Sequence, residues 1–270
     1  MTAPTVIRVT ALFEYPVKSC RRVRTSKAKI DRFGFSRDRR WMIVDAKGVF
    51  LTQRELPRMA LIRPDFKAEK LFLDAPGKPR IAIPRPDAGG HRFAVVWDDK
   101  VAVADVGDAA ARWLTEFLEF DVRLVAMTPD HARAVDADYA IGDNYTSLAD
   151  GFPFLLICEE SLIDLNTRLA APLPINRFRP NIVVRGCEPY AEDHWRRIRI
   201  GRCELAVVKP CGRCAITTID QETGERKGRE PLRALGRYRS RFGEVVFGQN
   251  LIHLNPGFGI SVGDVVQVLE

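Results

Sequence analysis

Two cysteines separated by two residues, in the segment 209–239, are the strongest chemical feature of the sequence. Cys211 and Cys214 enclose Gly212 and Arg213. The thiolate form of cysteine binds metals and attacks electrophiles, and a guanidinium beside a thiol favours that form. We therefore take this segment as the centre of a candidate site and ask which chemistry it serves.

Three interpretations compete for this Cys-x-x-Cys pair. In the first, the thiols are structural and half buried, as free cysteines usually are. In the second, they cycle between dithiol and disulfide. In the third, they bind a metal. A redox pair of this kind normally begins a helix that follows a strand. The β-branched run 215–219 predicts a strand instead, which counts against the second interpretation.

A structural zinc site is not expected. Such a site takes four ligands, typically two cysteine pairs or one pair with two histidines. The chain holds one pair, and its remaining cysteines are scattered: Cys20, Cys158, Cys187 and Cys203. One metal arrangement stays open, because a metal that carries other ligands on a cofactor needs only one soft protein thiolate.

The composition is that of a globular protein with a full core. Of the 270 residues 46% are hydrophobic, and 42 basic against 35 acidic residues give a formal net charge of +7. The basic residues are mixed with acidic ones, so nucleic-acid binding is not expected, and the surplus suits an acidic protein partner or an anionic cofactor. No apolar run spans a membrane, and no signal peptide or disulfide framework is visible. We expect a cytoplasmic protein without membrane contact.

The pattern of apolar residues predicts an α+β protein that is mainly β. Short strands separated by turns indicate a barrel or sandwich in the C-terminal half. A polar loop, 128–151, is expected to be mobile and to join two parts of the chain. The expected helices are 108–120, 159–169 and 231–238, and the expected strands or hairpins are 6–15, 41–52, 93–106, 122–127, 182–184, 198–200, 204–208, 215–219, 245–247 and 265–269.

Several ordered sequence blocks resemble one known family. Pro-Cys-x-Arg-Cys, followed by Thr-Thr-Ile-Asp-x-x-Thr-Gly, is similar to the C-terminal half of the MOSC domain, and more closely to the mitochondrial amidoxime reducing component and its bacterial relatives. The other blocks span nearly the whole chain and follow the family's order: Tyr15-Pro-Val-Lys-Ser-Cys, Arg37-Asp-Arg-Arg-Trp, Asn176-Arg-Phe-Arg-Pro-Asn and Tyr190-Ala-Glu-Asp. The resemblance implies a β-rich MOSC N-terminal domain over residues 1–125 and a MOSC β-barrel with a few helices over 126–270, with a cofactor held between them.

The resemblance also implies which residues bind that cofactor, a molybdenum pterin that ends in a phosphate. Cys214 is the expected metal ligand and catalytic residue. Cys211 receives no ligand role, and Arg37 and Arg40 are expected in ion pairs. The expected cofactor-binding residues are Lys18, Ser19, Arg39, Gly151, Phe152, Arg179, Asn181, Gly212, Arg213 and Asn250.

The activity that the resemblance implies is reduction of N-hydroxylated compounds such as amidoximes, hydroxylamines and N-hydroxylated nucleobases. No iron–sulfur spacing follows Cys214, so electrons are expected from a separate acidic ferredoxin- or flavodoxin-type protein with its reductase. Two alternatives stay open. MOSC domains also occur in molybdenum cofactor sulfurases, where a cysteine carries sulfur as a persulfide, and a cofactor-binding protein without turnover is the other.

Overall fold

One large sheet dominates the computed structural model, which describes residues 6–84, 91–128, 130–241 and 243–270. Its central strands are buried on both faces, since every residue of Phe154–Cys158 and the first three of Ile182–Arg185 are buried. In spatial order they are β19 (Val266–Val268), β14 (Arg197–Ile200), β15 (Cys203–Gly212), β17 (Glu244–His253), β12 (Phe154–Cys158), β13 (Ile182–Arg185), β1 (Arg8–Glu14) and β2 (Val23–Thr25), with β16 (Ser240–Arg241) beside β17. The prediction of a mainly β protein is confirmed.

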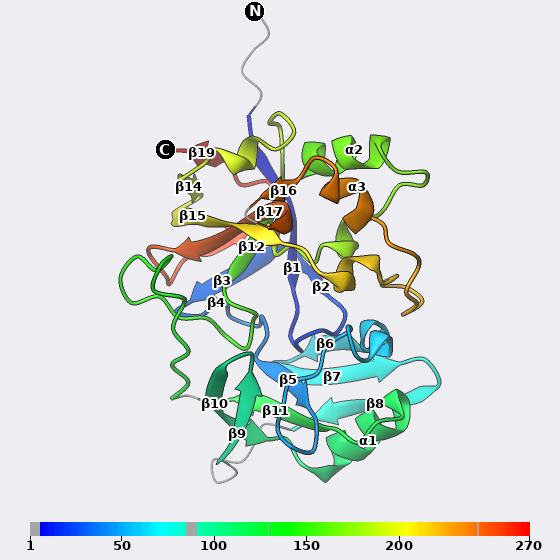
Figure 1. The fold of residues 1–270 in the computed structure, drawn as a ribbon. Coiled ribbons are helices and arrows are strands. Elements are labelled where there is room, and N and C mark those ends of the chain that lie inside the picture. The colour runs from blue at the N-terminus through cyan, green and yellow to red at the C-terminus, as the bar shows by residue number, and fades with distance from the viewer. Residues whose placement is uncertain (1–5, 85–90, 129, 242) are drawn as a thin grey trace, which may run out of the picture.

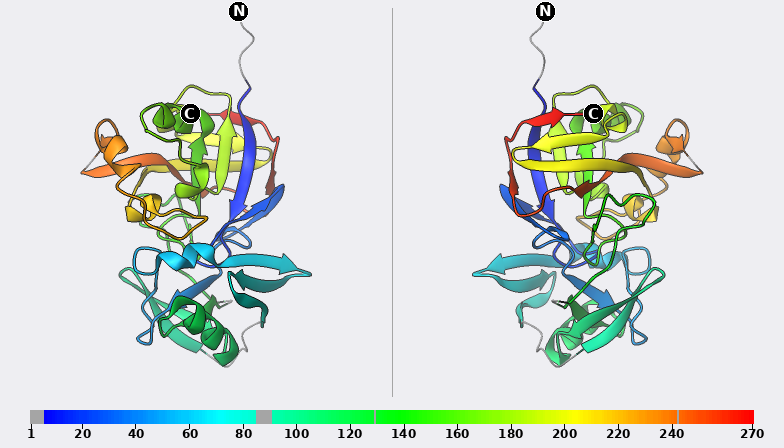
Figure 2. Two further views of the ribbon diagram at one scale, coloured as in Figure 1. Left: turned by 90° about the vertical axis from the view of Figure 1, so that its right-hand side faces the viewer. Right: turned by 90° about the vertical axis from the view of Figure 1, so that its left-hand side faces the viewer.

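Strand β1 closes this sheet into a barrel. On one side β1 pairs antiparallel with β13. On the other, Val9 N donates to Asp264 O at 2.9 Å and Val266 N donates to Ile7 O at 2.9 Å, just before β19. The long blue strand in Figure 2 therefore belongs to the barrel formed by the C-terminal half. The division at residue 125 stays a prediction, and a cut there would remove β1 from the barrel.

The barrel core draws on both ends of the chain. Leu12 and Ile30 are buried together with Leu156, Leu205 and Leu251. A small sheet at the barrel wall makes the same connection: its strands are β18 (Gly259–Ser261), β3 (Lys27–Asp31) and β4 (Gly34–Phe35). Strands β1 and β3 thus belong to the barrel although β13 and β18, with which they pair, lie more than 100 residues away.

Residues 41–127 form a second unit, in the lower half of Figure 1. Helix α1 (Asp108–Leu118) forms where predicted, and the face with Trp113, Leu114 and Phe117 is buried against this unit's core. Both predicted hairpins form as well. The strands of this unit are β5 (Trp41–Val44), β11 (Arg123–Met127), β10 (Asp99–Asp105) and β9 (His91–Val96) in one sheet, and β6 (Arg63–Lys67), β7 (Lys70–Ala75) and β8 (Lys78–Ile83) in the other, with the 3-10 helix η1 (Pro57–Leu61).

The remaining helices lie on the barrel side of the molecule. Helix α2 (Glu159–Thr167) confirms the second predicted helix, with Leu165 fully buried. The others are α3 (Leu232–Gly236) and the 3-10 helices η2 (Ile175–Arg177) and η3 (Ala191–Asp193). Among the described residues, no helix combines the length and apolar character that crossing a bilayer requires.

The predicted strand over 215–219 is wrong. The structure forms a 3-10 helix there, η4 (Ala215–Thr218). The hydroxyl of Thr217 donates to Cys214 O at 3.0 Å, and that of Thr218 donates to Ala215 O at 2.8 Å. Such bonds from threonine to a carbonyl three residues earlier compete with a strand ladder. The expected strand therefore no longer counts against a redox pair, since Cys214 directly precedes this helical turn.

The loop after β11 is packed at its two ends, while its middle, residues 136–143, is mostly exposed. Over residues 130–151 the side chains of His131, Val135 and Leu148 are buried. Arg133 joins the start of the loop to its end, because its guanidinium donates to Ala149 O at 2.6 Å and to Asp150 O at 2.7 Å. The loop carries the chain from the second unit back to the barrel, as Figure 1 shows in green.

A buried carboxyl at the end of β1 makes stability depend on pH. Burial, together with the charge of Asp38, raises the pKa of Glu14 to about 7. A carboxyl whose pKa is higher in the folded state stabilises the fold only while protonated, so this contribution is lost as pH rises from about 4.5 to 7. We expect Glu14→Gln to be neutral near pH 4.5 and to raise the free energy of unfolding at pH 8 by up to about 3 kcal/mol.

Urea unfolding of both proteins at the two pH values measures this difference. Glu119→Gln is the matched control, because the Glu119 side chain is 74% exposed in a surface ion pair. An effect of Glu14→Gln that is equal at both pH values would contradict the assignment.

Candidate functional site

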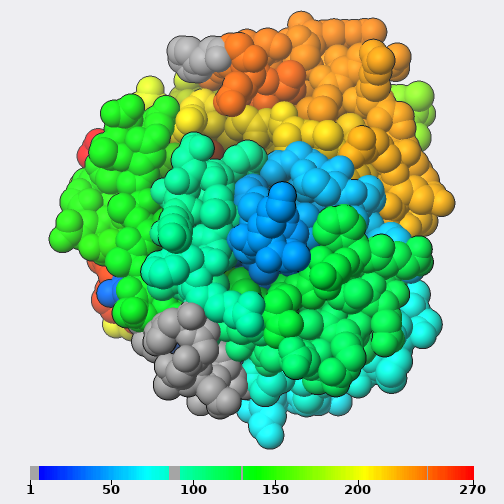
Figure 3. Space-filling view, turned by 60° about the horizontal axis from the view of Figure 1, so that its bottom comes forward, coloured from blue at the N-terminus to red at the C-terminus, as the bar shows by residue number. Residues whose placement is uncertain are grey.

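A cavity of about 860 Å³ collects every residue predicted for the site. It lies between the barrel and the second unit. Figure 3 shows the segments that meet on this face: the β9–β10 hairpin in teal, the chain near residue 50 in blue and strand β15 in yellow. The predicted residues in its lining are Lys18, Ser19, Arg39, Gly151, Phe152, Arg179, Asn181, Gly212, Arg213, Cys214 and Asn250.

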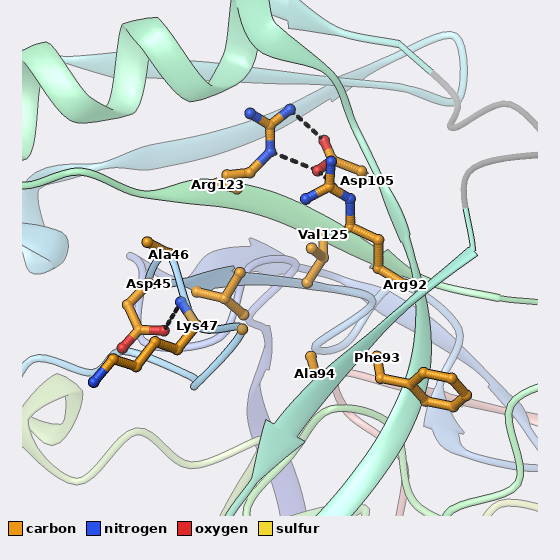
Figure 4. Close-up of a pocket in the computed structure, with 11 residues that line it drawn as sticks. Asp45, Ala46, Lys47, Arg92, Phe93, Ala94, Asp105, Arg123 and Val125 are labelled. Atoms are coloured by element: carbon orange, nitrogen blue, oxygen red, sulfur yellow. Dashed lines mark hydrogen bonds and ion pairs between the residues drawn. The ribbon is translucent and has the colours of Figure 1, made fainter.

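A second cavity, of about 350 Å³, lies in the second unit and is a weaker candidate. Figure 4 shows its charged residues. Arg123 donates to both carboxylate oxygens of Asp105, at 2.5 and 2.9 Å, and Arg92 lies 3.2 Å from the same carboxylate. No cysteine occurs among the described residues that line it. Its two arginines are paired with Asp105, so the larger cavity is the candidate site.

Cys214 lies where β15 has ended and η4 begins. It is the residue before the first turn of η4, and it is exposed. Its Sγ atom lies 3.7 Å from Nη1 of Arg54. The guanidinium next to this thiol therefore comes from a residue 160 positions away in the sequence, while that of Arg213 lies against Cys211.

Arg213 and Cys211 are turned toward each other. Nη1 of Arg213 donates to Sγ of Cys211 at 3.0 Å, and Nη2 donates to Phe178 O at 2.6 Å. The two residues sit on opposite sides of Gly212, where any Cβ would lie 2.6 Å from the Glu244 carboxylate. Cys211 and Cys214 both line the cavity but occupy different environments, since Cys211 is half-buried and bound by Arg213 whereas Cys214 is exposed.

A buried network holds Arg39 in the cavity wall. Its Nη1 donates to Asp38 Oδ2 at 2.5 Å and to Asn181 Oδ1 at 3.1 Å. The Asn181 amide also donates to Phe13 O and Asp38 Oδ1, and its Oδ1 accepts from Leu155 N. The hydrogen-bonding capacity of this amide is therefore spent within the protein. Burial alone would lower the pKa of Arg39, but the Asp38 carboxylate outweighs it and raises that pKa.

Lys18 also lies in the cavity wall and is paired with Asp150 at 2.6 Å. Burial lowers the pKa of Lys18 to about 8, although the Asp150 carboxylate opposes the shift. Desolvation inside the cavity would raise the pKa of Asp150 even though 67% of its side-chain surface is exposed, but the Lys18 ammonium outweighs it and holds that pKa well below its usual range. Ser19 follows in the left-handed conformation, with φ +64°, and its carbonyl accepts from the side chain of Gln53 at 2.7 Å.

Arg179 offers an unsatisfied donor. It has φ +56°, its guanidinium lies 4.3 Å from the centre of the Tyr15 ring, and Nη1 donates to Cys20 O at 2.9 Å. Its Nη2 is buried without a hydrogen-bond partner in the described part of the chain. Burial lowers the pKa of Arg179. A buried unpaired donor is costly, so this atom is set up to bind an acceptor from the cavity.

Arg37 and Arg40 stay outside the cavity lining, as expected of ion-pair residues. Arg37 pairs with Glu69 on the surface, and Arg40 pairs with Asp31 at 2.8 Å. Asp38, which lies between them in the sequence, is buried and accepts a hydrogen bond from Arg39. Of the three arginines in this segment, Arg39 lines the cavity, whereas Arg37 and Arg40 form ion pairs outside it.

The residues that the second unit contributes to the cavity were not predicted from the sequence. Trp97, at the turn of the β9–β10 hairpin, has φ +57° and donates through its indole to Asp150 at 3.3 Å. The guanidinium of Arg54 lies 4.8 Å from the Trp97 ring and connects it to Cys214. Thr52 also lines the cavity. The sequence signal that could have pointed to this contribution is a tryptophan directly before the predicted turn 98–100.

Taken together, the cavity presents one accessible thiol and several cationic groups. A thiol that faces a cavity can bind a soft metal or attack an electrophile. Guanidinium and ammonium groups with unspent donors bind phosphate or carboxylate. The arrangement suits an anionic ligand that brings a metal or an electrophile to Cys214.

Comparison with known proteins places the chain in a family. The MOSC N-terminal beta barrel domain matches residues 6–121, and the MOSC domain matches residues 143–267. The chain is 36% identical over 280 residues to mitochondrial amidoxime-reducing component 1 of Homo sapiens and to that of Mus musculus, covering 97% of this chain and 82% of each relative. Mitochondrial amidoxime reducing component 2 of Bos taurus is 36% identical over 86% of this chain and 72% of that protein. The resemblance noted in the sequence is confirmed, and the chain belongs to the MOSC-domain family of the amidoxime-reducing components.

Proposed function

We propose that this protein is a reductase of N-hydroxylated compounds that works with a molybdenum cofactor bound around Cys214. The observation that carries the proposal is the convergence of eleven residues, from distant parts of the chain, on one cavity. Its volume of about 860 Å³ lies within the range of roughly 300–1,000 Å³ that is typical of small-molecule sites. Membership in the family supports the same assignment.

The donors in the cavity wall fit the phosphate of such a cofactor. Nη2 of Arg179 and Nε of Arg213 are buried without partners in the described part of the chain. The Lys18 ammonium is paired with a carboxylate that is itself largely exposed, at 67% of its side-chain surface. An incoming phosphate therefore has charge-assisted donors available, and these make the stronger kind of hydrogen bond.

Each residue has a distinct task in this proposal. The bound metal would supply the two-electron chemistry that removes oxygen from nitrogen. Cys214 offers the thiolate, because it is exposed in the cavity while Cys211, which also lines the cavity, is half-buried and bound by Arg213. Asn181 acts by positioning Arg39, since its amide has no free capacity for the cofactor. The backbone of Gly151 and the side chain of Asn250 line the cavity for polar contacts.

Electrons would come from a separate acidic protein of the ferredoxin or flavodoxin type, served by its own reductase. The net charge of +7 supports this partner, because opposite charges steer such encounters. Small N-hydroxylated molecules are the proposed substrates. The cytoplasmic location and the lack of nucleic-acid and membrane binding stay predictions.

Sulfur transfer is the rival function, and one observation favours it. The Cys214 thiol is exposed next to Arg54, which suits a persulfide as well as a metal. A MOSC-type sulfur carrier would therefore use the same cysteine. The predictions that follow separate the two functions.

The first prediction concerns the metal. Cys214→Ala should keep the thermal stability of the parent, because the side chain is exposed, and should lower molybdenum content at least about tenfold through loss of the soft ligand. Cys211→Ala is the matched control and should keep most of the metal. Elemental analysis of protein purified from cofactor-producing cells measures both. Parent-like molybdenum in the Cys214 variant would refute its role as ligand.

The second prediction concerns the phosphate. Arg39→Ala should reduce cofactor retention about tenfold or more, because a hydrogen bond to a charged group contributes roughly 1.5–3 kcal/mol. Arg37→Ala is the matched control, since that side chain pairs with Glu69 at the surface. Retention is measured as oxidised pterin fluorescence after gel filtration. Equal losses in the two variants would show that position 39 has no special role.

The third prediction separates reductase from sulfur carrier. Cofactor-loaded protein with a low-potential donor should convert benzamidoxime to benzamidine. With a limiting acidic partner the rate should fall as ionic strength rises from about 0.01 to 0.15 M, because the screening length drops from roughly 30 to 8 Å. The carrier function predicts no benzamidine and a persulfide on Cys214 after treatment with a cysteine desulfurase. Such a result would replace the reductase proposal.

A further inference from the structure

A second pair of cysteines lies outside the cavity, where β12 passes into α2. Sγ of Cys158 lies 2.8 Å from Sγ of Cys187 and 2.8 Å from Oε2 of Glu160. Cys158 is fully buried, while Cys187 is half-buried. Figure 1 shows α2 at the end of the barrel that faces away from the second unit. None of these three residues lines the cavity around Cys214.

The backbone sets this geometry. Cys158 ends β12 and precedes the first turn of α2, and β12 runs parallel to β13 with Cys158 opposite Val184. Gly186 then turns the chain with φ +103°, and a Cβ there would lie 2.7 Å from Val6 O, so the position requires glycine. Its N–H donates to Oε1 of Glu160 at 3.0 Å. The turn places Cys187 against Cys158 and fixes the Glu160 carboxylate beside them.

Two chemistries fit two thiols and a carboxylate, namely a metal site and a disulfide. The three ligand atoms lie within 4.8 Å of one another. Two thiolates on a tetrahedral zinc, each about 2.3 Å from the metal, would stand about 3.8 Å apart, and such a site takes a fourth ligand. A disulfide needs the sulfurs at about 2.05 Å. The observed 2.8 Å is closer to the disulfide.

We propose that Cys158 and Cys187 form a reversible disulfide that ties the start of α2 to the end of β13, with Glu160 accepting the proton of the Cys158 thiol. The pair is thereby a modification site that is separate from the thiols of the cavity. The bond would fix the far ends of β12, which carries Leu155, and of β13, which begins directly after Asn181. Both of these residues line the cavity.

The oxidant is a small disulfide such as glutathione disulfide. The thiolate of Cys187, the more accessible sulfur, attacks one glutathione sulfur, forms a mixed disulfide and releases one glutathione thiolate. The Cys158 thiol then passes its proton to Glu160 and attacks the Cys187 sulfur, which releases the second glutathione thiolate. Two protein thiols are oxidised, two electrons reduce one glutathione disulfide, and two protons leave with the glutathione. The hydrogen bonds of Cys158 with Cys187 and Glu160, together with burial, raise its pKa, which agrees with its acting second.

The test uses the full chain, incubated with oxidised or reduced glutathione, alkylated and analysed by mass spectrometry. We expect the oxidised protein to lose two hydrogen atoms, to yield a peptide that links Cys158 to Cys187, and to melt about 5 °C higher than the reduced protein, because the bond closes a 29-residue loop. The Cys211→Ala/Cys214→Ala double variant, which removes the cavity thiols, should behave in the same way.

Variants of the pair make the proposal falsifiable. Cys187→Ser should abolish the linked peptide and the melting shift, and its partly exposed position keeps the reduced fold intact. Glu160→Gln should slow formation of the bond about tenfold or more, as loss of a proton acceptor does, without changing the final loss of two hydrogen atoms. A linked peptide that joins Cys211 to Cys214, or a melting shift that persists in Cys187→Ser, would overturn the assignment. So would one equivalent of zinc in the parent that Cys187→Ser loses, with no linked peptide.

Discussion

The Asp38 carboxylate is the constraint on which the cavity depends. It is almost fully buried and accepts hydrogen bonds from Tyr15 N at 2.8 Å, Arg39 Nη1 at 2.5 Å and Asn181 Nδ2 at 3.0 Å. A buried charge is tolerated only when it is paired and hydrogen-bonded. Here the three donors come from the end of β1, from the connection to the second unit and from the start of β13. One carboxylate thus fixes three segments at the point where they meet.

The cations of the wall are kept apart by an aromatic ring. Tyr15 lies between two guanidiniums, at 4.5 Å from Arg39 and 4.3 Å from Arg179. The ring faces attract positive charge, which offsets the repulsion between like charges held in a buried place. Arg39 is compensated by Asp38, whereas Arg179 keeps a free donor. The cavity therefore retains unsatisfied positive charge for an anion.

The cavity lies where the chain crosses between its two units. The first crossing, from β4 to β5, carries Arg39, and the return through 128–153 carries Asp150 and Gly151. The second unit adds Trp97 at a hairpin turn. Residues on such crossings face both units at once, so they can line a shared cavity without interrupting either core. A loop that connects rigid elements and carries binding residues follows the general rule that sites are built on loops held by a scaffold.

Local sequence determined most of the regular structure and the identity of the predicted site residues. The apolar periodicity of α1 and α2 and the hairpins of the second unit depend on neighbours within a few residues, and the family resemblance indicated the eleven cavity residues, eight of which lie in the quoted sequence blocks. Tertiary structure decided the rest. Closure of the barrel by β1, the guanidinium of Arg54 beside Cys214 and the contact between Cys158 and Cys187 all join residues that are distant in sequence. The periodicity of apolar residues does not predict such pairs, because the topology of the fold rather than local conformational preference brings them together. Even the local prediction at 215–219 failed, since threonine hydroxyls bound nearby carbonyls once the chain had left the β15 ladder.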